Sequence, residues 1–167
     1  FQTPGTDLLG FQFERSGWEK NGTYWLNLRQ AESAAIQFGD GECLCETAGG
    51  MGYELSPGTV QALEGFALAG GVTVLVPHLA YFSMRGVRKY EWPGTFSEFT
   101  PWMENYRTHA DNIEAALRRI GSGKPRRRIL LLSPDVAAWK DAAPSKTELG
   151  KARSARMKAL GSAFVRR

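Results

Sequence analysis

The chain has 167 residues, a net charge of +4 and 43% hydrophobic residues, enough for one sizeable core that buries roughly 70% of the unfolded surface. An aromatic content of 11% argues against intrinsic disorder, and no apolar run reaches the ~20 residues of a membrane span. The length also excludes a complete eight-stranded βα barrel, which usually takes ~250 residues.

Apolar periodicity and turn residues divide the chain into alternating strands and helices. In the first predicted helix, Leu28, Ala31, Ala35 and Phe38 share one face, and Gly39 ends the pattern. We predict strands over residues 8–13, 42–46, 72–77 and 129–132, and helices over residues 25–38, 60–69, 103–120 and 145–165.

Strands that alternate with helices in this way are typical of an α/β protein with a parallel sheet. Residues 72–77 and 129–132 are unbroken apolar runs, as in strands buried on both faces. Four βα units make either half of an eight-stranded barrel or one small doubly wound domain. We treat residues 1–167 as a single domain, in which residues 1–125 carry the candidate site and residues 126–167 form a basic terminal βα unit.

Charge is unevenly distributed along the chain. Residues 1–117 hold 14 acidic and 7 basic side chains, whereas residues 118–167 hold 14 basic and 3 acidic ones. A basic segment can indicate a nucleic-acid partner, but a solvated helix face or a basic surface that docks on an acidic one is favoured here. The segment Gly121–Lys124 is no phosphate-binding loop, because Pro125 replaces the required Ser or Thr and the loop precedes a strand.

Cys43 and Cys45 are the only cysteines, and they lie in an apolar run. A zinc site needs further cysteine or histidine ligands at a wider spacing, so we expect two buried free thiols, no metal and no cofactor. Free thiols fit a reducing compartment, and the first residues lack the features of a secretory signal. We therefore expect a cytoplasmic protein that does not contact a membrane.

Parallel α/β sheets place function at the carboxyl ends of their strands. Here these ends carry Glu46, followed by glycines that let a ligand approach the backbone, and His78 on the next strand. Such a carboxylate can act as nucleophile or base in glycoside hydrolysis, whose oxocarbenium-like transition state needs paired carboxyl groups. The alternatives are a solvent-exposed strand-end glutamate and a hydrogen-bonded structural histidine.

The loop over residues 78–100 is long and rich in aromatic and basic side chains, which is typical of a functional loop. Its aromatic rings can stack on the apolar faces of sugars or anchor the loop on the protein. Its basic side chains can bind a carboxylate or phosphate, or pair with Glu91 and Glu98. The candidate substrate contacts are His78, Tyr53, Arg85, Tyr81, Trp92 and Trp102.

Several segments are specific through their order and spacing: residues 30–39 and 44–53, residues 70–86, and residues 88–93 with 101–102. Together they resemble barrel glycoside hydrolases of the α-L-rhamnosidase-like family, and residues 3–7 resemble an upstream strand-end motif of these enzymes. The resemblance covers about residues 1–140 and implies that they match the later strands of a catalytic TIM barrel.

The resemblance also implies a site. Glu46 matches the strand-end catalytic carboxylate, nucleophile or base, and His78 matches a sugar contact at the end of the last barrel strand. Such enzymes are several times longer, and their second catalytic carboxylate lies on an earlier strand that this sequence does not contain. Asp7, Glu54 or a residue of another subunit would have to supply it.

Buried strands cannot leave both sheet edges in water, so we expect two chains to close one eight-stranded barrel as a homodimer. We predict an α/β half (β/α)8 barrel that binds carbohydrate and hydrolyses glycosidic bonds, with Glu46 and Asp7 as its catalytic residues. The alternatives are a non-catalytic carbohydrate-binding remnant and, less favoured, a nucleic-acid or polyanion binder that uses the basic C-terminal segment.

Overall fold

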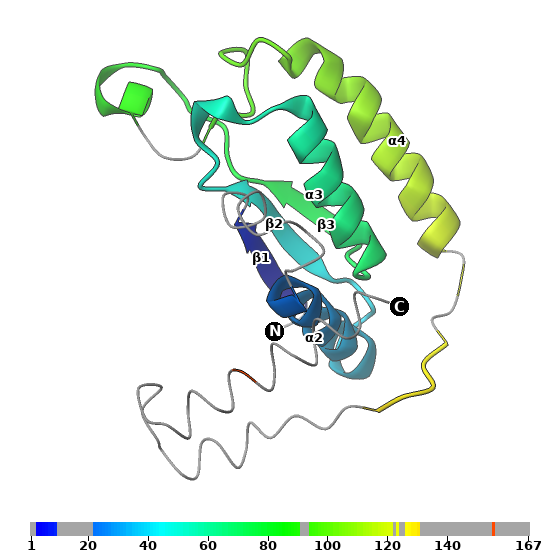
Figure 1. Ribbon diagram of the computed structural model, residues 1–167. Coiled ribbons are helices and arrows are strands. Elements are labelled where there is room, and N and C mark those ends of the chain that lie inside the picture. The colour runs from blue at the N-terminus through cyan, green and yellow to red at the C-terminus, as the bar shows by residue number, and fades with distance from the viewer. Residues whose placement is uncertain are drawn as a thin grey trace.

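The computed structural model describes residues 3–9, 22–90, 94–121, 123, 126–130 and 155. Three parallel strands form one sheet in the order β1, β2, β3 (Figure 1), so the protein is α/β, as predicted. The strands are β1 at Gly5–Leu9, β2 at Leu44–Gly49 and β3 at Val74–Pro77; the helices are α2 at Gly22–Phe38, α3 at Pro57–Ala69 and α4 at Met103–Gly121; short 3-10 helices are η2 at Gly52–Glu54 and η3 at Gly86–Tyr90.

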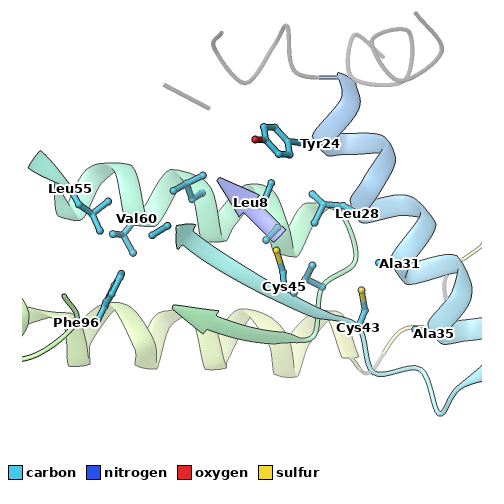
Figure 2. Packing of buried hydrophobic residues seen from close by; sticks show 14 residues of the cluster. Leu8, Tyr24, Leu28, Ala31, Ala35, Cys43, Cys45, Leu55, Val60 and Phe96 are labelled. Carbon is cyan, nitrogen blue, oxygen red and sulfur yellow. The ribbon is translucent and has the colours of Figure 1, made fainter. Parts of the chain in front are cut away.

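The core lies on one face of the sheet, under α2 and α3. Leu8 of β1 and Cys45 of β2 are buried there against Leu28 of α2 and Val60 of α3 (Figure 2). The helix α4 packs against α3 (Figure 1). Because consecutive strands are neighbours in the sheet, two crossover connections of the same hand place both helices on the same face.

The opposite face of the sheet carries every second strand residue, among them Asp7, Glu46 and Val76, which are aligned in the strand register. No helix packs on this face within the described part of the chain, and Val76 is 41% exposed. The sheet therefore has one covered face that holds the core and one open face that holds the polar strand-end residues.

The predicted buried face of α2 is confirmed at Leu28, Ala31 and Ala35, but it is wrong at Phe38, which is 84% exposed. The helix has 17 residues and is ~25 Å long, whereas the six residues of β2 span ~20 Å. The last turn of α2 therefore reaches past the sheet, and no described residue covers the aromatic side chain of Phe38.

Two strands have bounds that differ from the predicted ones. The first begins at Gly5, three residues earlier than predicted, and predicted residues 10–13 lie outside the described chain. The second is shifted towards its carboxyl end, so that Gly49 belongs to the strand. Glu46 consequently lies in the middle of β2, directly opposite Asp7 in the strand register, and does not end the strand.

The predicted fourth strand is wrong at Ile129 and Leu130, which form no strand and are 73% and 78% exposed. An apolar run becomes a strand only where another strand pairs with it, and none of the described strands does. Residues 131–132 lie outside the described chain, as does the predicted last helix apart from Ala155, which is helical. None of the described helices has the length and apolar character needed to span a bilayer.

Candidate functional site

Three ionisable side chains gather towards the carboxyl end of the sheet. Asp7 of β1 lies beside Glu46 of β2 in the strand register, on the open face. His78 follows β3 directly, and its backbone N–H donates to the Thr47 carbonyl at 2.8 Å, which extends the pairing of β2 and β3. Glu46 and His78 thus lie on adjacent strands, as the sequence predicts, and Asp7 joins them from the third strand.

Glu46 and His78 face each other across neighbouring strands. Nε2 of His78 lies 3.7 Å from Oε1 of Glu46, and both side chains are partly exposed. The other ring nitrogen, Nδ1, is buried without a hydrogen-bond partner among the described residues. The imidazole therefore lies beside the carboxylate, at a distance longer than a direct hydrogen bond.

The electrostatics of Asp7 differ from those of an ordinary surface aspartate. Partial burial raises its pKa above the usual 3.8, the negative charge of Glu46 raises it further, and His78 opposes the two with a lowering effect. A carboxyl group that holds its proton more tightly beside a second carboxylate is the arrangement that acid–base catalysis requires.

Gly49 keeps the space between the two carboxylates open. A Cβ atom at this position would lie 3.8 Å from Oδ1 of Asp7, 3.8 Å from Oε1 of Glu46 and 3.2 Å from Cδ2 of Leu9. The two carboxylate oxygens are therefore no farther apart than twice 3.8 Å. Both are therefore close enough to act on one bond placed between them, and the Leu9 side chain borders the same space.

Tyr24 of the core is close enough to this region to be affected by the charge of Asp7. It lies in the first turn of α2 and is 7% exposed (Figure 2). Burial raises the pKa of its hydroxyl, and the negative charge of Asp7 is the second cause. A tyrosine at the start of a helix carries no sequence signal for this role, because the contact depends on how α2 returns over β1.

The loop after β3 contributes less than the sequence predicts. Tyr81 is 7% exposed, and the guanidinium carbon of Arg88 lies 5.7 Å from the centre of its ring, so Tyr81 anchors the loop. Arg85 is exposed, and in the described region its side chain contacts none of the three ionisable residues at the sheet end. Trp92 lies outside the described residues.

Tyr53 and Trp102 come together in a separate place, a pocket of about 310 Å³ beyond the end of β2. The Tyr53 hydroxyl donates to the carbonyl of Arg88, which fixes a ring that is 48% exposed. Nε1 of Trp102 donates to the Leu55 carbonyl at 3.0 Å, and its ring packs edge-on against Phe96. Trp102 is therefore part of the core as well as part of the pocket wall.

The two thiols are buried, as predicted. Burial raises the pKa of Cys45 to about 12, and the charge of Asp7 is the next cause. Burial also raises the pKa of Cys43. Both stay protonated at neutral pH and are poor nucleophiles. No group of three His, Cys, Asp or Glu side chains in the described ranges is arranged to hold a metal ion.

A second buried ionisable cluster joins α3 to α4 and was not predicted as such. Glu64 is 1% exposed; its Oε2 lies 2.6 Å from Nε2 of His109, and its Oε1 accepts a 3.2 Å hydrogen bond from the Tyr106 hydroxyl. His109 therefore lies between the two helices. The polar groups satisfy one another and fix the register of the two helices.

Comparisons with protein-family models, with curated proteins and with solved structures found no match to this chain.

Proposed function

We propose that the protein is a glycoside hydrolase in which Asp7 and Glu46 act on the same glycosidic bond. The observation that carries the proposal is the pair itself: two carboxylates that are aligned on adjacent strands, on an open sheet face, with Gly49 near both. Glycosidases that cleave through an oxocarbenium-like transition state need two such groups, one to donate a proton and one to attack or to activate water.

The electrostatics favour one division of roles. Asp7, whose pKa is raised by burial and by Glu46, is the general acid that protonates the leaving oxygen. Glu46 is the nucleophile or the general base, and Nε2 of His78 lies 3.7 Å from its carboxylate. This assignment supplies from Asp7 the second carboxylate that the family resemblance leaves open.

The sheet is compatible with part of a βα barrel. Strands β1, β2 and β3 are in sequence order, and the helices between them lie on one face only, as they do in a barrel. One half of a doubly wound sheet has the same arrangement, so the choice of a barrel rests on the family resemblance. We propose that the open face with Asp7 and Glu46 belongs to a barrel interior, and that a second copy of the chain completes it.

Hydrolysis of a panel of chromogenic aryl glycosides tests the proposal. We expect turnover by the wild-type protein and at least a 100-fold loss in Glu46→Gln, which removes the charge but keeps the shape. The matched control is Glu42→Gln, an exposed glutamate before β2 on the same segment, which should leave the rate unchanged. Sugar binding without turnover would instead support a non-catalytic binding module, and salt-sensitive binding of RNA or DNA a polyanion binder.

A further inference from the structure

We infer that the pocket beyond β2 is a second sugar-binding subsite, which takes a neutral pyranose ring. The inference rests on the proposed function for the identity of its ligand class. It assigns binding roles to Glu54 and Phe99, neither of which belongs to the site described above.

The pocket is built by two segments that are far apart in the sequence. One is the stretch from η2 to the start of α3, and the other is residues 94–102 before α4. At Gly94 the two backbones touch, because a Cβ there would lie 2.6 Å from the carbonyl oxygen of Gly52. The hydrogen bond from Trp102 to Leu55 ties the same two segments at 3.0 Å. The pocket is therefore preformed, and its volume of about 310 Å³ is small enough to favour a single ring over a large ligand.

Most of the polar groups in its walls already have partners. The Ser56 hydroxyl accepts from the backbone N–H of Thr59 at 3.1 Å and so caps α3. The Thr100 hydroxyl donates to the Thr95 carbonyl. In contrast, the exposed carboxylate of Glu54 makes no hydrogen bond or ion pair with any other residue that the structure describes. It is the acceptor that the pocket offers to a ligand.

Aromatic surface supplies the rest of the lining. Tyr53 and Phe99 are 48% and 43% exposed, which is high for residues that line a pocket, and Trp102 adds a partly buried indole. A pyranose matches this combination, because its C–H face packs on aromatic rings while its rim hydroxyls donate to a carboxylate.

The chain connects the pocket directly to the strand that carries Glu46. Only Gly50 and Met51 separate the last residue of β2 from η2, so the pocket lies beyond the carboxyl end of that strand.

Titration of the full chain with the methyl glycosides of glucose, galactose, mannose and rhamnose, followed by NMR at the indole N–H of Trp102, tests the subsite. A Trp102→Phe variant assigns that resonance. We expect one of these sugars to shift it, with an affinity that falls about tenfold in Phe99→Ala and at least tenfold in Glu54→Gln. The matched controls are Phe82→Ala and Glu98→Gln, exposed residues outside the pocket, which should bind as the wild type does.

The subsite is wrong if no sugar shifts the Trp102 signal, or if Phe82→Ala weakens binding as much as Phe99→Ala. It is also wrong if choline binds in place of sugars, because an aromatic pocket with a carboxylate can hold an ammonium ion. If a sugar shifts the Trp102 signal but no glycoside is hydrolysed, the proposed function is wrong and the subsite is supported. If glycosides are hydrolysed but no sugar shifts the Trp102 signal, only the subsite is wrong.

Discussion

Three features of the fold affect the pKa of the Asp7 carboxyl group. The strand register places Glu46 beside it, His78 follows the next strand but one, and partial burial removes part of its hydration. Burial and Glu46 favour the protonated form and outweigh His78. A proton held in this way is useful in catalysis, but it also makes the folded state less favourable wherever the carboxyl must ionise.

Asp7→Asn should therefore raise the stability of the protein at neutral pH. The pKa of Asp7 in the folded state lies above its unfolded value of 3.8. The group therefore stabilises the fold below pH 3.8, where it is protonated in both states, and this contribution is lost as the pH rises through the folded pKa. Asparagine does not titrate. Thermal unfolding should show Asp7→Asn above the wild type at pH 7 but not at pH 3, and an Asp7→Asn protein that melts lower at pH 7 would contradict the electrostatic account.

Glu64 is a buried glutamate that joins α3 to α4, and its removal should lower the free energy of unfolding. Glu64→Ala leaves His109 and Tyr106 without their partner between α3 and α4, which we expect to cost about 3–5 kcal/mol in urea unfolding. The control is Glu114→Ala, which breaks an exposed ion pair with Arg118 and should cost less than about 1 kcal/mol. Equal losses in the two variants would mean that the buried cluster adds nothing to helix packing.

Among the elements, α2 and the end of α3 approach each other most closely at a glycine pair. A Cβ at Gly70 would lie 2.7 Å from Cδ1 of Leu28, and one at Gly71 would lie 2.5 Å from the carboxylate of Glu32. Gly71 also has a φ of +100°, which side chains with a Cβ rarely adopt. Glu32 is held by Arg29 at 2.8 Å, so it cannot simply move aside.

Two glycine substitutions, one in α3 and one just after it, should therefore have opposite effects. Gly71→Ala combines a strained backbone with a clash and should destabilise the protein by about 1–3 kcal/mol. Gly65→Ala adds a methyl group inside α3 where nothing lies within 4 Å, and it should stabilise by about 0.5–1 kcal/mol. Both values can be read from urea unfolding, and a Gly71→Ala protein as stable as Gly65→Ala would show that this junction is not tight.

Sequence patterns predicted the elements better than the contacts between them. The helical spacing located α2 with its Leu28 face, and the strand-end rule brought Glu46 and His78 together. The pairing of Asp7 with Glu46 depends on a strand register, and that of Glu64 with His109 on how two helices meet. Neither leaves a periodic signal in one sequence, because both are fixed by packing between segments that are distant along the chain.

On the scale of the whole molecule, the open face of the sheet is the feature that most needs a partner. Val76 of the edge strand β3 is 41% exposed on that face, beside Glu46 and in line with Asp7, and no described strand pairs with the outer edges of β1 and β3. A sheet with one open face and two unpaired edges is prone to pair with another chain. The site lies on this face, so whatever covers it also removes water from the carboxylates.

Association between copies should depend on this face. We expect light scattering to show a dimer or larger homo-oligomer at micromolar concentration, and Val76→Asp to dissociate it, because a buried charge on the sheet face is costly. The control Val87→Asp alters an exposed valine of η3, away from the sheet, and should leave the assembly intact. A well-folded wild-type monomer, or equal loss in both variants, would contradict assembly through the open face.

The most direct test of the paired carboxylates is the pH dependence of kcat/KM for an aryl glycoside, in the wild type and in Asp7→Asn. We predict a bell-shaped wild-type profile whose fall at higher pH reports the loss of the Asp7 proton. In Asp7→Asn that fall should disappear and the maximal rate should drop by about 10²–10⁴-fold. An Asp7→Asn profile with the same shape and rate as the wild type would contradict the assignment of Asp7 and Glu46 as one catalytic pair.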